Sequence, residues 1–246
     1  MNGSVDMATV LESLRPVSGS GGLVGADPVL CAHVLGVDGV AVSLTVNGGL
    51  GELLWCTPDS ASARLEDLQF TMGQGPGPEA AASGRVVLAA DLAQIPGDRW
   101  PALLPEAEAL GVRAVFCFPL HVGGACLGSL TLQRAAAGLL PEAALGDALV
   151  LATALTAVVL EGGETREAFA AAEDHSVFYR AAVHQATGMI SVQAGVPLPQ
   201  ALLRLRSHAY RCGRSVVEVA EDVVARRVHF RNDGEEPPDV SGRRRG

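Results

Sequence analysis

Strict alternation of apolar and polar positions marks the first strand that the sequence predicts. Residues 39–46 place valine or leucine at every second position, a period of two that is typical of a half-buried strand. The Asn-Gly-Gly run at 47–49 predicts a turn, and residues 53–56 are expected to form the returning strand. The positions between the large apolar residues, on the other face, are Ala41, Ser43 and Thr45.

A second hairpin is predicted over residues 112–133. The apolar run 112–122 leads into Gly123-Gly124, which suits a two-residue turn, and residues 125–133 return. In that register Cys126 lies opposite His121, so a disulfide between Cys117 and Cys126 is not favoured.

Helical patterns fill the stretches around the hairpins. We expect short helices near 61–68, 78–83 and 101–110, and a longer helix over 141–160 that begins with proline. Hairpins interrupted by helices predict an α+β domain with helices packed on an antiparallel sheet.

The C-terminal part reads as three helices. The first is predicted over 164–194, and the second over 198–211 with Gly213 as its C-cap. A capping box at 215–218 starts the third helix. The predicted core positions are Phe178, Ala182, Ala186, Met189 and Ile190 in the first helix, Leu202, Leu205 and Ala209 in the second, and Val216, Val219, Ala220, Val223 and Val224 in the third.

The distribution of charge divides the 246-residue chain after residue 163, where the predicted C-terminal helices begin. The whole chain carries a formal net charge of −9, and a chain this acidic is not expected to be a general nucleic-acid binder. Residues 1–163 hold 6 Arg and 16 acidic residues, a net of −10, whereas residues 176–231 hold 8 Arg and 3 acidic residues, a net of +5. This asymmetry indicates two domains with different partners. Residues 232–246 lack any apolar period and are expected to be disordered.

Several kinds of site are disfavoured by the sequence. The five cysteines are odd in number and contain no C-x-x-C pair, so a reduced cytoplasm is the expected setting. The N-terminus lacks the features of a signal peptide, and no apolar run is expected to be long enough to span a membrane, since the longest, 148–160, reads as a core helix. No two of the six scattered histidines lie four residues apart, so no metal site is expected.

The glycine-rich run 73–78 fails G-x-G-x-x-G and predicts a tight loop before a short helix. Asp91 and Asp98 flank Arg99-Trp100-Pro101, a pattern that predicts a helix start with a capping aspartate.

Arginines of the second domain are the strongest chemical signal. Arg204 and Arg211 lie two turns apart on one helix face, and Arg206 projects about 160° from Arg204. Guanidinium groups form bidentate phosphate contacts and stack on bases, which suits RNA or DNA. The alternative is a solvated face, with Arg226 and Arg227 complementing the dipole at a helix end. The candidate RNA-binding residues are Arg204, Arg206, Arg211 and Arg214.

The second domain resembles the ANTAR family. The resembling segments are 184–195 (His-Gln-Ala-Thr-Gly-Met-Ile and onward), 201–209 (Ala-Leu-Leu-Arg-Leu-Arg-Ser-His-Ala) and 217–220, within about 170–230. The resemblance implies a three-helix RNA-binding module of transcription antitermination regulators that binds paired stem-loops as a dimer. Arg206, in the Leu-Arg-x-x-Ala motif, is the residue that this match places best.

The first domain resembles the GAF family, of the kind that precedes ANTAR in actinobacterial-type regulators. The resembling segments are 73–78, 91–92, 99–101, 111–120 and 128–132. Relatives often carry a cysteine where this chain has Gly77, which argues against thiol or covalent cofactor chemistry at that loop. GAF domains bind varied small ligands or none, so the resemblance leaves the cofactor unknown.

The sequence therefore predicts a cytoplasmic regulator that is not an enzyme. We expect a GAF-like sensor at 24–162, an ANTAR domain with its connecting helix at 163–230, and a disordered tail at 231–246. The expected partners are RNA stem-loops, a second copy of the chain and a small ligand of the GAF domain, without a membrane. Two alternatives remain open: a protein-interaction or dimerisation regulator with no RNA target, and a GAF-fold thiol enzyme.

Overall fold

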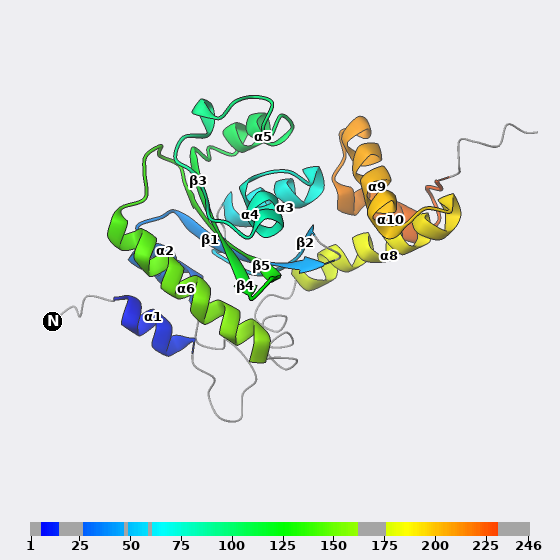
Figure 1. The fold of residues 1–246 in the computed structure, drawn as a ribbon. Helices are drawn as coiled ribbons and strands as arrows, with labels where there is room; N and C mark the ends of the chain where they lie inside the picture. Colours follow the sequence, from blue (N-terminus) through cyan, green and yellow to red (C-terminus); the bar gives the residue numbers. More distant parts are fainter. Residues whose placement is uncertain (1–5, 15–26, 47–48, 59–60, 162–175, 231–246) are drawn as a thin grey trace, which may run out of the picture. The chain divides into compact units, whose positions relative to one another are not determined.

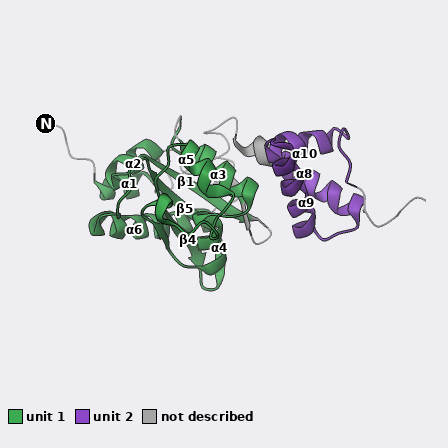
Figure 2. Ribbon diagram, turned by 90° about the horizontal axis from the view of Figure 1, so that it is seen from above, with its two compact units in different colours: residues 1–180 green, residues 181–246 purple. Residues whose placement is uncertain are grey.

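The computed structural model describes residues 6–14, 27–46, 49–58, 61–161 and 176–230 (Figure 1). They belong to two compact units, residues 1–180 and 181–246 (Figure 2). The predicted connecting helix before residue 176 and the predicted tail from residue 231 onward lie outside the described residues.

The first unit is built on a five-stranded antiparallel sheet in the order β2-β1-β5-β4-β3. Its strands are β1 (Gly39–Val46), β2 (Gly49–Cys56), β3 (Val87–Ala89), β4 (Ala114–Val122) and β5 (Ala125–Arg134). Both predicted hairpins are confirmed, although β2 begins four residues before the predicted start at 53. In the second hairpin His121 pairs with Cys126, as the two-residue turn predicts, and all five cysteines are free.

Helices cover both faces of this sheet (Figure 1). One face packs against α1 (Met7–Ser13), α2 (Pro28–Leu35) and α6 (Glu142–Glu161). The other packs against α3 (Ala61–Met72), α4 (Pro76–Ser83) and α5 (Leu103–Ala109), with a 3₁₀ turn, η1, at Leu92–Gln94. The hydrophobic pattern predicted α3 to α6 but neither α1 nor α2.

Both faces of β1 are buried, so the prediction of a half-buried strand is wrong. Val40 and Val42 lie in the core beneath α2 and α6. On the opposite face Ala41 and Ser43 are also buried, at 1% and 0% exposed, because α3 packs over them. The small polar residues that looked solvent-facing in the sequence therefore form part of an interior layer.

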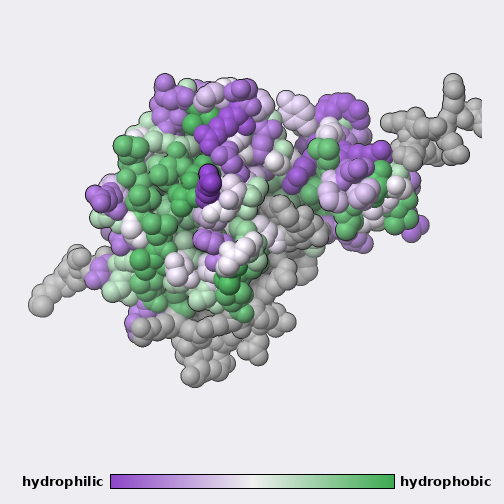
Figure 3. Space-filling model, viewed as in Figure 1, coloured by the Kyte–Doolittle hydropathy of each residue, from purple (hydrophilic) through white to green (hydrophobic). Residues whose placement is uncertain are grey.

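Helix α6 is the longest helix of the first unit that the structure describes, and its two sides differ. Over Glu142–Leu160 it is long and apolar enough to cross a membrane by length and composition, contrary to the expectation that no such segment exists. Its inner side nonetheless lies in the core through Ala148, Leu151 and Leu155, and a core helix can pass the same test. Its outer side leaves Leu149 and Leu160 46% and 55% exposed, and Figure 3 shows hydrophobic surface over this helix.

The second unit is the predicted helical bundle of α8 (Ser176–Ala194), α9 (Leu198–Cys212) and α10 (Val216–Val224). Gly213 takes the left-handed C-cap conformation, and Ser215 and Glu218 form the predicted capping box. The side chain of Phe178 lies outside the described residues. The fully buried core residues are Val183, Ala186, Ile190, Ala201, Leu205, Ala209, Val219, Ala220 and Val223. Many are alanines, which lets the helix backbones approach closely.

Candidate nucleic-acid interface

The four predicted RNA-binding arginines lie on α9 and in the turn that follows it. Arg204 and Arg206 are half-buried, whereas Arg211 and Arg214 are exposed. Arg211 Nη2 lies 3.3 Å from His208 Nδ1, one turn before it on the same helix. The structure therefore presents a basic helix whose four predicted arginines are not equivalent. They differ in exposure, and Arg211 also contacts His208.

Arg214 is engaged within the unit. Its Nη1 lies 2.8 Å from Asp222 Oδ2, and Asp222 Oδ1 lies 2.6 Å from Arg227 Nη2. The hydrogen bonds from Arg214 and then Arg227 hold the pKa of Asp222 below its ordinary value, and Asp222 raises the pKa of Arg214. One carboxylate thus ties the turn after α9 to the end of α10, so a phosphate at Arg214 or Arg227 would compete with Asp222.

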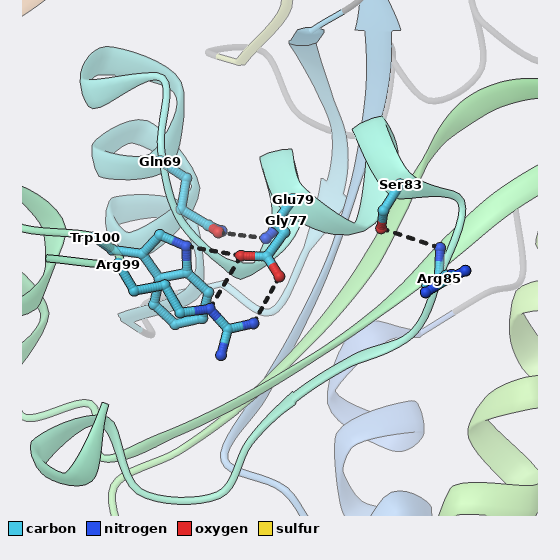
Figure 4. Close-up of polar contacts among 7 residues, drawn as sticks. All are labelled: Gln69, Gly77, Glu79, Ser83, Arg85, Arg99 and Trp100. Atoms are coloured by element: carbon cyan, nitrogen blue, oxygen red, sulfur yellow. Dashed lines mark hydrogen bonds and ion pairs between the residues drawn. The ribbon is translucent and has the colours of Figure 1, made fainter. Parts of the chain in front are cut away.

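In the first unit the glycine-rich run forms the turn between α3 and α4, as predicted. Pro76 begins α4, and the Gly77 N–H donates to Gln69 Oε1 at 2.7 Å, as Figure 4 shows. Gly75 has φ +135°, and a Cβ there would lie 2.7 Å from the same Gln69 oxygen. Glycine is required here to let the α3 side chain cap α4, so the motif has a structural role.

Glu79 of α4 holds the segment before α5 in place. It accepts hydrogen bonds from Arg99 Nη2 at 2.6 Å and from Trp100 Nε1 at 3.1 Å, and Arg99 also stacks over the Trp100 ring (Figure 4). Bonding to Arg99 lowers the pKa of Glu79.

The predicted aspartate cap lies elsewhere: α5 starts without a side-chain cap. Asp91 instead caps η1, and it accepts from Arg113. The pattern around residues 98–101 therefore predicted the presence of a helix. The predicted aspartate cap of that helix is wrong, because α5 begins at Leu103, beyond the reach of Asp98.

A buried polar network lies between the sheet and α3, and the sequence did not predict it. Glu66 is 1% exposed and accepts hydrogen bonds from the Ser43 hydroxyl and from Gln69 Nε2, the latter at 2.8 Å. Ser129 lies opposite Ser43 in the sheet, and its fully buried hydroxyl forms no hydrogen bond with the described residues. The polar positions on one face of β1 were the available signal, but their partners are 23 and more residues away.

The buried thiols of the first unit are poor nucleophiles. Cys117 is fully buried beside Thr131, and burial raises its thiol pKa. Burial also raises the pKa of Cys31 to about 12. Because the thiolate is the reactive form, neither group is activated for covalent chemistry. Within the described residues no group of three or more His, Cys, Asp or Glu could hold a metal ion.

Comparison with known proteins assigns both units. Residues 29–160 match the GAF domain family, and residues 177–224 match the ANTAR domain family. No curated protein matches the chain in sequence.

Solved structures of low identity are also similar to part of the chain. One is the GAF domain of an Acinetobacter phosphoenolpyruvate-protein phosphotransferase, at 14% identity and TM-score 0.48, covering 63% of this chain and 90% of that one. Another is the free methionine-R-sulfoxide reductase of Neisseria meningitidis, at 18% identity and TM-score 0.47, covering 66% and 89%. The GAF match spans more than half of the chain, which therefore belongs to the GAF domain family and carries an ANTAR domain in its second unit.

Proposed function

We propose that the protein is a signal-responsive regulator of transcription antitermination, in which the ANTAR unit binds RNA stem-loops and the GAF unit provides sensory or dimerisation input. The observation that carries this proposal is the ANTAR match at 177–224, which coincides with a helical bundle rich in arginine. The region 176–231 has a net charge of +5 within an acidic chain, so its electrostatic attraction to phosphate is local.

The arginines of this unit are unequal candidates for RNA contact. Arg206 follows Leu205 in the motif that resembles the family pattern, and Arg204 and Arg211 lie two turns apart on α9. Arg214 is engaged by Asp222 and must exchange that ion pair for a phosphate. We therefore expect substitution of Arg204, Arg206 or Arg211 to weaken RNA binding more than substitution of Arg214.

The test is to crosslink the protein to RNA in cells, sequence the bound RNA, and measure binding of a recovered hairpin in vitro. Recurring tandem stem-loops support antitermination, and Arg206→Ala should weaken hairpin binding by about tenfold, or about 1.4 kcal/mol. Arg85→Ala, at an exposed arginine of the first unit, is the matched control. A recovered set without recurring stem-loops contradicts the proposal, as does unchanged binding by a folded Arg206→Ala protein.

We propose that the protein dimerises through the outer side of α6. Leu149, Thr153 and Leu160 recur on this side at intervals of four and seven residues, with Val150 beside them 48% exposed. A heptad-like seam is complementary to its own copy across a two-fold axis, which makes a second copy of this chain the fitting occupant. Leu149→Glu should lower the molar mass measured by light scattering, whereas Val29→Glu, at an equally exposed apolar position on α2, should not. A dimer that persists in Leu149→Glu, or a wild-type monomer, contradicts this assignment.

A regulatory role fits the first unit better than thiol catalysis. Gly77 stands where the GAF resemblance often implies a cysteine, and Cys31 and Cys117 have raised pKa values from burial. We also propose a cytoplasmic location, which rests on the odd number of cysteines and the lack of a C-x-x-C pair. Native mass spectrometry of the purified protein distinguishes a ligand-binding sensor, which would carry a small molecule, from a GAF unit that only dimerises.

A further inference from the structure

The second unit contains an open groove away from the predicted α9 arginines. It has a volume of about 620 Å³, within the range of ligand-binding sites. Gly188, Met189 and Val192 of α8 line one side, and Arg226 and His229, which follow α10, line the other. Gln185 and Gln193, two turns apart on α8, also line what we call the α8 groove.

Gly188 has no role in internal packing. It lies inside α8 with ordinary helical backbone geometry, and a Cβ at this position would meet nothing within 4 Å. Glycine in a helix interior is less stable than alanine, so the chain accepts a cost that its own packing does not require. The missing side chain leaves the helix backbone open to close approach from outside the chain.

Arg226, which lines the groove on the side opposite Gly188, also carries a conformational cost. Its φ is +59°, and it is the only non-glycine residue of the described chain with positive φ. Glycine adopts this conformation after a helix end without strain, so arginine is retained at a conformational cost. In the described part of the chain no carboxylate pairs with Arg226, whereas the adjacent Arg227 lies 2.6 Å from Asp222.

The segment that carries Arg226 and His229 is fixed in position. The Arg227 N–H donates to the Asp222 carbonyl at 2.7 Å, and the Phe230 N–H donates to Gln193 Oε1 at 3.1 Å. The Phe230 ring meets His208 of α9 edge-on, with centroids 5.3 Å apart. Both sides of the groove are therefore built by specific contacts before any partner arrives.

We propose that the α8 groove receives an unstacked nucleobase, with its adjoining phosphate, from the loop of an RNA hairpin. Val192 is 86% exposed, the largest exposed fraction among the large apolar side chains that the structure describes, and it offers contact to the face of a base together with Met189. Gly188 lets a flat ring approach the helix backbone, and Arg226 supplies a cation for the phosphate. Single-stranded RNA loops are recognised through such splayed-out bases.

This proposal rests on the proposed RNA-binding function and adds a loop-recognition site to the α9 arginines. The Gln185 amide can donate to and accept from base edges, and the amide nitrogen of Gln193, whose oxygen accepts from Phe230, can donate, which an acidic peptide would not need. The net charge of +5 over residues 176–231 favours a polyanion. An acidic protein partner is the competing occupant and is an outcome of the test.

The experiment uses the full chain and a hairpin RNA recovered by crosslinking, in its natural form and with abasic nucleotides in the loop. Gly188→Ala and Arg226→Gly should each weaken binding of the natural hairpin by about tenfold. Neither should lower the melting temperature, since alanine favours the helix and glycine relieves the positive φ. Against the abasic loop, Gly188→Ala should bind as the wild type does.

The matched control is Gly146→Ala, at an exposed glycine of α6 whose Cβ would also meet nothing within 4 Å, and it should leave RNA binding unchanged. If the wild type binds no stem-loop RNA, the proposed function and the groove proposal both fail. If the wild type binds and both groove variants bind equally well, the function stands and the groove proposal is overturned. Groove variants that lose an acidic protein partner but keep RNA affinity also overturn it.

Discussion

The buried network around Glu66 makes a sharp prediction about stability. Glu66→Ala removes the acceptor for the Ser43 hydroxyl and for the Gln69 amide. Both donors remain enclosed, because Ser43 and Gln69 are each 0% exposed. Ser129→Ala changes the same layer in the opposite sense, because it removes a buried hydroxyl that forms no hydrogen bond with the described residues.

The two substitutions should differ in sign. A buried donor left without an acceptor costs about 1–3 kcal/mol, so Glu66→Ala should lower the free energy of unfolding by about 2–6 kcal/mol. That is a large share of the roughly 5–15 kcal/mol that keeps a typical domain folded. Ser129→Ala should be neutral or should raise the free energy of unfolding by up to about 1 kcal/mol, because a desolvated hydroxyl is lost.

Urea unfolding followed by circular dichroism measures both changes, with the slope of the transition checked for constancy. Glu66→Gln keeps one oxygen acceptor and should fall between the wild type and Glu66→Ala. A loss below about 1 kcal/mol in Glu66→Ala would mean that the network contributes little. A loss above about 1 kcal/mol in Ser129→Ala would mean that its hydroxyl has a partner after all.

Three further outcomes are expected. Glu79→Gln should destabilise the protein by at most about 1 kcal/mol at pH 7, because the ion pair is partly exposed, and thermal unfolding should show this difference beginning to shrink below about pH 4.5. The pKa of Glu79 is lowered on folding, so its contribution is present above its unfolded value of about 4.5 and is lost as pH falls through the folded value. Ser215→Ala removes the capping box and should cost about 1 kcal/mol in urea unfolding, with Ser207→Ala, an exposed mid-helix serine, as control. Iodoacetamide at pH 8 should label exposed Cys212 in the native protein and leave Cys31 unlabelled, as peptide mass spectrometry would show.

Features set by neighbouring residues could be predicted from the sequence. Gly123-Gly124 fixed the register that places His121 opposite Cys126. The Ser215–Glu218 capping box and the Gly213 C-cap appear where the sequence placed them, because each depends on contacts within a few residues. The α+β class followed from the same local signals, since hairpins and helical periods alternate along the first unit.

Features set by distant contacts could not be predicted. Alternation along β1 shows which residues share a face, but only the position of α3 decides that the Ser43 face is buried. Likewise, Arg214 looked available for phosphate until the fold placed Asp222 2.8 Å away. The α8 groove joins residue 188 to residue 226 across the bundle, so no sequence window contains both of its sides.

The two units differ in whether internal contacts explain the residues that are unfavourable for stability. In the first unit, the positive-φ Gly75 is explained by Gln69, and the buried Glu66 by Ser43 and Gln69. In the second unit, Gly188 and Arg226 each cost stability: a Cβ at position 188 would meet nothing within 4 Å, and no carboxylate of the described chain pairs with the positive-φ Arg226. Residues that weaken a fold persist where they serve a purpose outside it, such as binding. This contrast supports the proposal that the α8 groove is a recognition site, and the support does not depend on the number of arginines on α9.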